Sequence, residues 1–542
     1  VSTLNSGIYT ATFNSLAFTG GIFMGQTGVN VTGGTCSLNV TNDLSIAFSS
    51  STDKFRGISM TSISGTNNTA IFQLNVGGNM MISGQALAEY TSSAGAGIET
   101  TVIGQNFNVS GGTNSHNFGA AAAAHSNSIS IGSNFTQTGG TLYFSRFGGR
   151  NNITVNGNLS LSSGTLSNKS STGSSTTTVE GNFFMSGGTF FLHNNTTEVT
   201  PDPCVVNVNG TFNHSGGTIN FDDNTSNLSA THILQLNGSA VSLTGTGVMT
   251  HGGPGTCTAF GQVTFASNGL QQYTRAATHS LNQVKQRVEN GCTLRVISGS
   301  VQVASHATAA TDYFRILNGA RVEIGNQQFQ SNALYANTGL QVDSGGTLAL
   351  SRTSGLYDGT LNAVITTNGN MDFSLHSHST IEYNGLLDQT LTGTGVGIAI
   401  GTQHRYGRLK ISLQGAPSSK VQPVTHNVFI RTQLDIEQGE LFLNAYRINI
   451  QNGEASAIIR NSGYVKSETN SPINTGEIVW ENMQSGTHVF PFGIDQNNYI
   501  PVSLSPNNGI GNTIRISTRH TDVDDNAPLP PNVPLKGLAS IP

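Results

Sequence analysis

The chain has 542 residues, of which 9% are charged and 36% are hydrophobic, with a formal net charge of −5. No stretch approaches the roughly 20 apolar residues that cross a bilayer as a helix. No cluster of lysine and arginine offers the basic surface that nucleic acid or an anionic membrane requires. Polarity comes instead from 66 glycines and from serine, threonine and asparagine, which favour turns. We therefore expect an all-β chain without a transmembrane segment or a nucleic-acid partner.

An eight-residue phrase recurs along the first half of the chain. Its five clearest copies are NFNVSGGT (106–113), NFTQTGGT (134–141), NLSLSSGT (158–165), NFFMSGGT (182–189) and TFNHSGGT (211–218). With fainter copies on either side, successive copies are 24–29 residues apart. Such a period, with alternating apolar residues and tolerance of insertions, matches one turn of a three-sided parallel β-helix and excludes helical repeats. The fold we predict is a right-handed parallel β-helix, or β-solenoid.

Residues at the same place in successive phrases should stack as columns. The aromatic residue at the second position predicts an interior column, completed by Leu159, that contains Phe107, Phe135, Phe183 and Phe212. The residue after the final threonine predicts a second interior column of Leu142, Leu166, Phe190 and Ile219. The asparagine at the first position predicts an amide column at a turn, formed by Asn106, Asn134, Asn158 and Asn182. The glycine before the threonine suits a positive φ angle. All these roles are structural.

Proline use and the regularity of the repeat divide the chain into three predicted segments. Residues 1–255 form the parallel β-helix with coils of 24–29 residues, and residues 256–460 continue it less regularly. Residues 461–542 form a C-terminal β-sandwich-like module that ends in the Pro-rich segment APLPPNVP. Residues 1–200 contain no proline, whereas nine of the 14 prolines follow residue 470. This distribution is expected where backbone donors of the first segment are needed for hydrogen bonds between strands.

The C-terminal half resembles a known class of proteins. The segments that carry the resemblance are STIEYNGLLDQTL (379–391), YGRLKISLQG (406–415), LDIEQGELFLNAYRINIQ (434–451) and GEIVWENMQSGTHVFPFGIDQNNYIPVSL (476–504). They resemble strand-turn units of large, adhesin-like surface proteins of Bacteroidota that are exported by type IX secretion. The resemblance covers roughly residues 256–510. It implies an extracellular location on the bacterial cell surface and partners among cell-surface or secretion-system proteins.

An enzyme is the main alternative, because parallel β-helices also serve as polysaccharide lyases and hydrolases. Such reactions need clustered carboxylates, or basic groups beside a Ca²⁺ or proton-transfer site. Residues 1–200 contain only six acids, residues 100–179 contain none, and the repeat does not align the six on one column. We therefore expect no catalytic residues and no cofactor, with a polysaccharide-degrading enzyme as the alternative.

Two acidic segments and one histidine pair are candidate metal sites. Asp522, Asp524 and Asp525 in TDVDDN carry oxygen ligands at a spacing that can hold Ca²⁺, and so do Asp222 and Asp223 in FDDN. Solvated acidic turns are the alternative for both segments. The histidines of LHSHS, which are His376 and His378, alternate onto one strand face as metal-binding pairs can. No third ligand is near them in sequence, which favours a solvated strand face.

The four cysteines are too sparse for a disulfide scaffold. A disulfide between Cys204 and Cys257 would span about two coils, and the alternative is four buried thiols, including Cys36 and Cys292. The sequence as a whole favours a non-enzymatic surface protein, either an adhesin or a structural rod or stalk. Insertions such as 117–128 and 193–204 would supply a binding face, on which exposed tyrosine and asparagine could bind glycans.

Overall fold

A computed structural model describes most of the chain. The described residues are 8–19, 34–48, 54–56, 59–60, 70–84, 87–89, 92–93, 97–115, 126–145, 149–170, 173–194, 202–223, 231–251, 261–306, 313–331, 337–357, 364–366, 370–391, 405–416, 418–423, 426–468, 476–506 and 512–518. The chain divides into two compact units. Unit 1 comprises Val1–Ala349, Gly359–Ser379 and Gly397–Ile400, and unit 2 comprises Leu350–Asp358, Thr380–Val396 and Gly401–Pro542.

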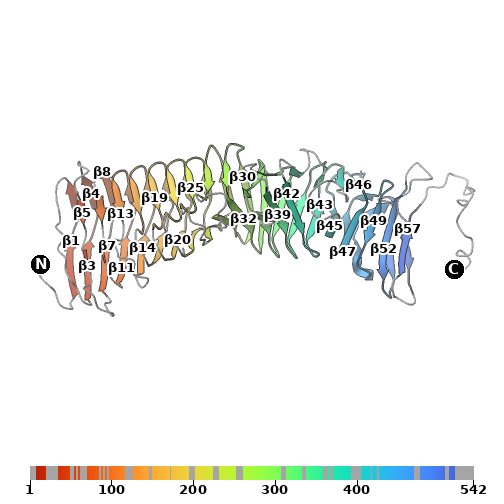
Figure 1. The fold of residues 1–542 in the computed structure, drawn as a ribbon, viewed down its shortest axis with the longest axis horizontal. Helices are drawn as coiled ribbons and strands as arrows, with labels where there is room; N and C mark the ends of the chain where they lie inside the picture. The colour runs from red at the N-terminus through yellow and green to blue at the C-terminus, as the bar shows by residue number, and fades with distance from the viewer. Residues whose placement is uncertain are drawn as a thin grey trace, which may run out of the picture. The chain divides into compact units, whose positions relative to one another are not determined.

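Three parallel sheets form unit 1, and the chain visits them in turn. Figure 1 shows the strands of the first sheet following one another in chain order. They are β1 (Ile8–Phe13), β3 (Gly34–Val40), β7 (Ala70–Val76), β11 (Gly97–Ile103), β14 (Ser126–Ile131), β17 (Arg150–Val155), β20 (Ser175–Val179), β23 (Cys204–Val208), β26 (His232–Leu236), β29 (Gly261–Phe265), β32 (Val284–Val288), β36 (Phe314–Ile316), β39 (Asn337–Val342) and β42 (Asn370–Leu375). Only β35 (Ser305–His306) joins this sheet antiparallel, among the strands described.

The second sheet takes the next strand of each coil. Its members in unit 1 are β2 (Leu16–Thr19), β4 (Leu44–Phe48), β8 (Met80–Gly84), β12 (Phe107–Val109), β15 (Phe135–Gln137), β18 (Leu159–Leu161), β21 (Phe183–Met185), β24 (Phe212–His214), β27 (Ala240–Leu243), β30 (Gly269–Arg275), β33 (Cys292–Ser298) and β37 (Arg321–Gly325). These strands pair in parallel, as in β15–β18 and β21–β24.

The third sheet closes each coil. Its strands are β5 (Lys54–Arg56), β9 (Leu87–Glu89), β13 (Thr113–Ser115), β16 (Thr141–Tyr143), β19 (Thr165–Ser167), β22 (Thr189–Phe191), β25 (Thr218–Asn220), β28 (Val248–Thr250) and β31 (Ser280–Asn282). Shorter sheets in this unit contain β34 (Val301–Val303), β38 (Phe329–Ser331) and β41 (Ile365–Thr366), and β6 (Ser59–Met60) with β10 (Ser92–Ser93). β40 (Thr347–Leu350) begins at the end of this unit.

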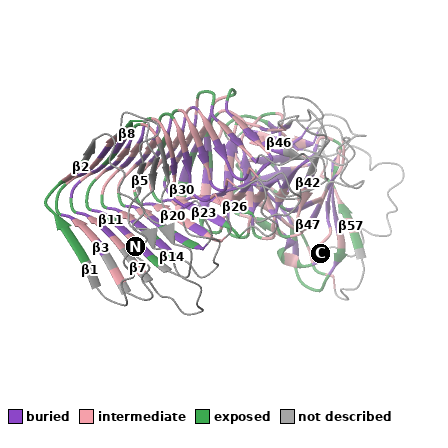
Figure 2. Ribbon diagram, turned by 60° about the vertical axis from the view of Figure 1, so that its left-hand side comes forward, coloured by how far each residue is buried: buried purple, intermediate pink, exposed green. Residues whose placement is uncertain are grey.

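The interior of unit 1 is built from columns of apolar side chains. Register aligns Phe107 with Phe135, and Phe183 with Phe212, on neighbouring strands of the second sheet. All four rings are at most 2% exposed, and the Phe183 and Phe212 rings stack with centroids 5.1 Å apart. The third sheet aligns Leu142, Leu166, Phe190 and Ile219 in the same way, all fully buried. Figure 2 shows buried positions alternating with intermediate ones along these strands.

An amide column follows one turn of the coils. The side-chain Oδ1 of each asparagine accepts the backbone N–H of the equivalent residue in the next coil. These bonds measure 3.2 Å from Asn134 N to Asn106 Oδ1, 2.8 Å from Asn158 N to Asn134 Oδ1 and 2.8 Å from Asn182 N to Asn158 Oδ1. The column begins at Asp43, whose Oδ1 accepts from Asn79 N, and it ends where Thr211 N donates to Asn182 Oδ1.

Glycine is required just before the third sheet. The residues before the aligned threonines have positive φ angles, namely Gly112 (76°), Gly140 (69°), Gly164 (85°), Gly188 (76°) and Gly217 (80°). A Cβ on Gly140 would also lie 2.5 Å from the backbone of Gly111 in the preceding coil. Other residues are therefore disfavoured by conformation and by coil spacing together. The sequence-based prediction for these glycines is confirmed.

Unit 2 also contains stacked parallel strands. One sheet contains β43 (Thr380–Tyr383), β45 (Arg405–Ser412), β47 (Val428–Gln438), β49 (Arg447–Ile450), β50 (Ile458–Arg460) and β52 (Glu477–Met483), and the antiparallel β57 (Asn512–Ile516) pairs with β52. A second contains β44 (Gln389–Leu391), β46 (Lys420–Pro423), β48 (Glu440–Phe442) and β51 (Tyr464–Lys466). Antiparallel hairpins follow: β53 (His488–Phe490) with β56 (Val502–Leu504), and β54 (Gly493–Asp495) with β55 (Asn498–Tyr499).

The predicted all-β solenoid of parallel strands is confirmed. The described residues contain one helical element, the 3₁₀ turn η1 (Ala455–Ala457), and no helix that is long and apolar enough to cross a membrane. Parallel stacking continues through β51 and β52, beyond the predicted start of the C-terminal module at residue 461. The three-segment division of the chain stays a prediction, and the Pro-rich end lies outside the described residues.

We expect Phe183→Ala to lower the free energy of unfolding by about 3–5 kcal/mol, because it leaves a cavity in the aromatic column. Phe184→Ala is the matched control, since the neighbouring ring points outward and is 39% exposed. The control should change stability by no more than about 0.5 kcal/mol. Urea unfolding followed by circular dichroism compares the two, and equal losses would contradict the interior column.

We expect Asn158→Ala to cost about 1–3 kcal/mol, because the backbone N–H of Asn182 loses its acceptor. Asn213→Ala is the control, since Asn213 lies between two buried residues of β24 and faces outward. Hydrogen exchange of the Asn182 amide provides a local readout. Unchanged protection of that amide in the Asn158 variant would argue against the column.

Candidate functional site

A column of polar side chains runs inside unit 1 at the corner where the chain leaves the third sheet. Its members lie two residues after the ends of β16, β19, β22 and β25, and are Ser145, Lys169, His193 and Asp222. Strand register aligns these ends, so the four residues occupy equivalent places in successive coils. All four are at most 1% exposed. Such buried polar groups require partners inside the protein.

A second column faces the first, at the start of the first sheet. Ser175 begins β20, Cys204 begins β23 and His232 begins β26. Register pairs Ser175 with Cys204, and the pairing of the residues that follow aligns Cys204 with His232. The third sheet ends and the first begins at the same corner, which brings the two columns within hydrogen-bonding distance.

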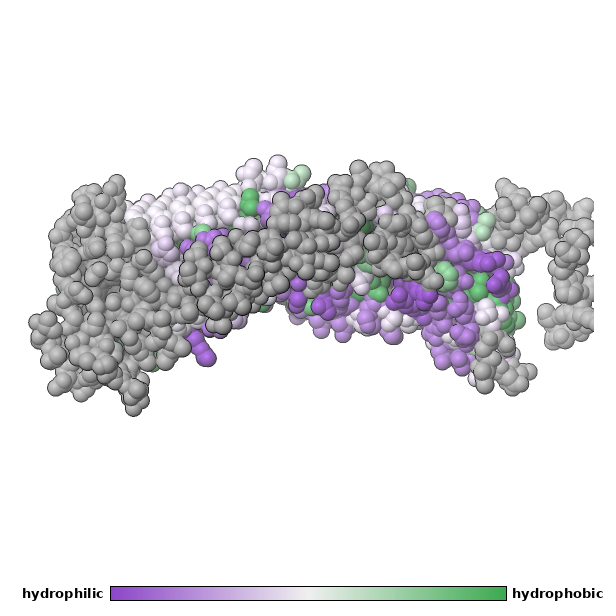
Figure 3. All heavy atoms as spheres, viewed as in Figure 1, coloured by the Kyte–Doolittle hydropathy of each residue, from purple (hydrophilic) through white to green (hydrophobic). Residues whose placement is uncertain are grey.

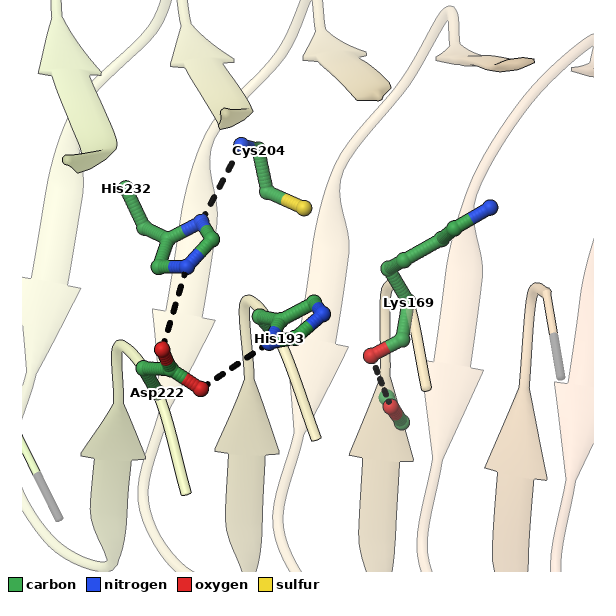
Figure 4. A network of polar contacts seen from close by, with 6 residues as sticks. Lys169, His193, Cys204, Asp222 and His232 are labelled. Carbon is green, nitrogen blue, oxygen red and sulfur yellow. Dashed lines mark hydrogen bonds and ion pairs between the residues drawn. The ribbon is translucent and has the colours of Figure 1, made fainter. Parts of the chain in front are cut away.

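Asp222 lies between two imidazoles at this corner (Figure 4). His193 Nδ1 is 2.9 Å from Asp222 Oδ1, and His232 Nε2 is 3.4 Å from Asp222 Oδ2. The two rings stack with centroids 4.9 Å apart and planes inclined by 11°. The side chains are 0–1% exposed. We call His193, Asp222 and His232 the buried triad.

Electrostatics keep the Asp222 carboxyl ionised. Burial by itself raises its pKa, but the hydrogen bonds from His193 and His232 outweigh burial and hold the pKa well below its usual range. The backbone N–H of Cys204 donates to His232 Nδ1 at 3.1 Å. This bond assigns the neutral tautomer in which His232 Nε2 carries the proton and directs it at the carboxylate.

Lys169 belongs to the same column, but its amine contacts residues of the preceding coil. Its Nζ donates to the carbonyl of Gly149 at 2.8 Å and lies 3.5 Å from Ser145 Oγ. Figure 4 shows its amine pointing away from the His193 ring. The neighbouring Asn168 Oδ1 accepts from Ser175 Oγ at 3.0 Å and from Thr177 Oγ1 at 2.6 Å. The corner is thus polar through several coils.

Two imidazoles and one carboxylate form a donor set that transition metals favour. One ligand atom from each residue of the buried triad lies within 4.8 Å of the other two. The side chains are almost completely shielded from solvent, so a polymer could not reach them at the surface. The arrangement can therefore hold a proton or a small ion, and it cannot act directly on a polysaccharide.

A second buried histidine pair lies further along unit 1. His279 Nε2 is 3.0 Å from His214 Nδ1, and both side chains are fully buried. The Arg275 guanidinium bonds to the carbonyl of His279 and, at 3.0 Å, to Gln302 Oε1. Burial lowers the pKa of His214 to about 4. Burial, with the charges of His214 and Arg275, lowers the pKa of His279 to about 3. Both rings are therefore neutral near neutral pH.

The structure separates the predicted metal candidates. Asp222 belongs to the buried triad, and its neighbour Asp223 does not. The pKa of Asp223 is raised by burial and by the charge of Asp222. His376 and His378 are exposed and lie in the turn after β42, so their predicted placement on one strand face is wrong. Their rings are 6.1 Å apart. The acidic segment with Asp522, Asp524 and Asp525 lies outside the described residues.

The predicted column residues contribute to stacking, as described for the fold. Cys204 and Cys292 are buried thiols, which does not support a disulfide between Cys204 and Cys257. Cys257 itself lies outside the described residues, and so does the side chain of Cys36.

Sequence reasoning missed His193 and His232. The signal was present, because extending the repeated phrase by four residues past its threonine aligns Lys169, His193 and Asp222. The eight-residue phrase ends at its threonine, and the polar variation beyond it resembles a variable insertion. His232 could not be found in this way, because its contact depends on two columns meeting at a corner.

Comparison of the chain with known protein families, curated proteins and solved structures finds no match.

We expect stability to fall with acidification because His214 and His279 are buried as neutral rings. Below pH about 6.5 the unfolded chain takes up protons that the native pair does not bind. The free energy of unfolding should then decrease by about 1.4 kcal/mol per pH unit for each histidine, down to the native pKa values. Urea unfolding between pH 7.5 and pH 4.5 measures the slope.

His279→Gln should flatten this slope by about one histidine's share, whereas His376→Gln removes an exposed ring and should leave it unchanged. A His279→Gln slope equal to that of the native chain would show that the buried pair is not responsible. Both variants require a circular dichroism spectrum like that of the native chain.

Proposed function

We propose that the chain is a non-enzymatic extracellular protein of the bacterial cell surface, acting as an adhesin or a structural stalk. The observation that carries this proposal is that the repeated side chains pack inside the solenoid and bond to neighbouring coils. The aromatic residues fill the interior, and each asparagine of the column bonds to the next coil. Repetition on this pattern serves coil stacking, and a scaffold of stacked coils presents the same outward positions again and again.

The outward positions of the first sheet suit contact with polar partners. Register aligns Ser128 with Asn152 and Asn152 with Thr176, in rows separated by the strand spacing of about 4.8 Å. Ser128 and Asn152 are exposed and Thr176 is half-buried. Figure 3 shows a pale surface, near zero hydropathy, over the region of β19 and β25 of the third sheet. Short hydroxyls and amides on regular rows could bind glycans or other surface proteins.

The resemblance of residues 256–510 to Bacteroidota surface proteins supports export by a type IX-like secretion system. In such proteins the strand-turn units precede a C-terminal sorting signal. The partners we propose are cell-surface or secretion-system proteins, and glycans at the outward face.

A polysaccharide-degrading enzyme is the second candidate, and one feature of unit 2 favours it. Register aligns Glu382, Lys410 and Asp435 on β43, β45 and β47. The two acids are two strand spacings apart, or about 9–10 Å between backbones, near the carboxyl separation of inverting glycosidases. Burial raises the pKa of Asp435, Glu437 and Glu382 add to the rise, and Lys410 and Arg408 oppose it. The same alignment is also explained by a structural role, in which Lys410 lies between the two acids and the alternating charges stabilise the sheet.

Incubation with plant, algal and host polysaccharides separates the two candidates. We expect no new reducing ends and no unsaturated products, from either the native chain or Asp435→Asn. Turnover by the native chain that Asp435→Asn abolishes would replace the proposal with the enzyme.

Localisation tests the rest of the proposal. On intact source cells the chain should be accessible to antibody and to added protease, and it should accumulate inside cells whose type IX translocon is deleted. Surface display that persists in those cells would refute the export route, and a chain found only inside wild-type cells would refute the proposal itself.

A further inference from the structure

We propose that the buried triad binds one divalent transition-metal ion of the zinc class, as a structural site inside the solenoid. The site is independent of the proposed surface function. It rests on His193, Asp222 and His232, whose ligand atoms converge within 4.8 Å. The three residues come from distant points in the sequence and are brought together only by coil register.

The carboxylate orientation supplies enough donors. Asp222 Oδ1 faces His193 Nδ1 at 2.9 Å, and Oδ2 faces His232 Nε2 at 3.4 Å. Each oxygen is thus directed toward a different imidazole across a common centre. A carboxylate bound through both oxygens, together with two imidazole nitrogens, gives the four donors that structural zinc sites use. Metal–ligand bonds of about 2.0–2.2 Å require only small movements from these separations.

The ion takes the place of protons. In the metal-free triad, His193 Nδ1–H and His232 Nε2–H are directed at the carboxylate. Each neutral imidazole carries a single proton, so binding shifts that proton to the opposite ring nitrogen and leaves both rings neutral. For His232 that nitrogen is Nδ1, which accepts the N–H of Cys204 in the metal-free form. The hydrogen bond from Cys204 is therefore lost when the ion binds.

Burial assigns a structural role to the ion. The triad side chains are 0–1% exposed, so no coordination position opens toward a substrate. His193 follows β22, Asp222 follows β25 and His232 begins β26. An ion at the triad would therefore cross-link successive coils at this corner. Because the site is closed, we expect the ion to enter during folding.

The other buried histidine pair is a poor site by the same criteria. His214 and His279 face each other without a carboxylate in the pair, and the Arg275 guanidinium beside them repels a cation. His279→Gln is therefore a matched control for the loss of a buried histidine.

The experiment measures metal bound by the full chain. The protein is unfolded in chelator and refolded with excess Zn²⁺ or Co²⁺, and unbound metal is removed. We expect one equivalent of metal per chain by mass spectrometry, and d–d absorption of the cobalt form with the intensity of a four-coordinate site. The thermal midpoint should be higher after refolding with Zn²⁺ than after refolding in chelator.

Asp222→Asn should lose the bound metal and the Zn²⁺-dependent rise in midpoint, while His279→Gln keeps both. His232→Gln is the second ligand variant, used if Asp222→Asn fails to give a native circular dichroism spectrum. A native chain that refolds without retaining metal overturns the proposal. Cobalt absorption that persists in folded Asp222→Asn or His232→Gln also overturns it, because the ion would then lie elsewhere.

Discussion

The hydrogen bonds between successive coils are the constraint on which the rest of the molecule depends. They hold equivalent residues about 4.8 Å apart and in fixed register, so every side chain meets its counterpart from the coils before and after. An apolar residue is buried if its counterparts are apolar, as Phe183 and Phe212 show. A polar residue in the interior must find its partner in a neighbouring coil, and Asp222 finds His193 in that way. Packing and chemistry are thus both decided by alignment.

This constraint explains why one architecture contains both very regular and chemically distinct parts. Where the repeated phrase is strongest, the columns are uniform and the asparagine amides bond to one another's backbones. In the same coils, buried positions within the phrase or just after it accept histidine and aspartate, as at His214, His193 and Asp222. His214 lies on β24 two residues after the column residue Phe212, and its partner His279 is 65 residues away in sequence. The interior tolerates such groups because each has a partner in hydrogen-bonding distance.

The sequence was sufficient to predict the columns but not the corners. The positions of Phe107, Phe135 and Asn134 follow from a repeat that can be aligned by eye, because residues one coil apart are neighbours. The triad also depends on the end of a third-sheet strand lying beside the start of a first-sheet strand. The spacing of the repeats contains no information on that contact. Asp222 was therefore predicted only as a Ca²⁺ ligand beside Asp223 or as part of an acidic turn, without its histidine partners. The prediction that His376 and His378 lie on one strand face was wrong for a related reason. Alternating histidines in the sequence do not distinguish a strand from a two-residue turn.

The asparagine column also has an electrical direction. Every Oδ1 in it accepts from the following coil, so the side-chain amide dipoles point the same way and add, as peptide dipoles do in a helix. The positive end faces the N-terminal coils, and there the column begins with a carboxylate, since Asp43 Oδ1 accepts the backbone N–H of Asn79 at 2.6 Å and its side-chain N–H at 3.2 Å. Asp43 thereby acts toward the column as an acidic cap acts toward a helix.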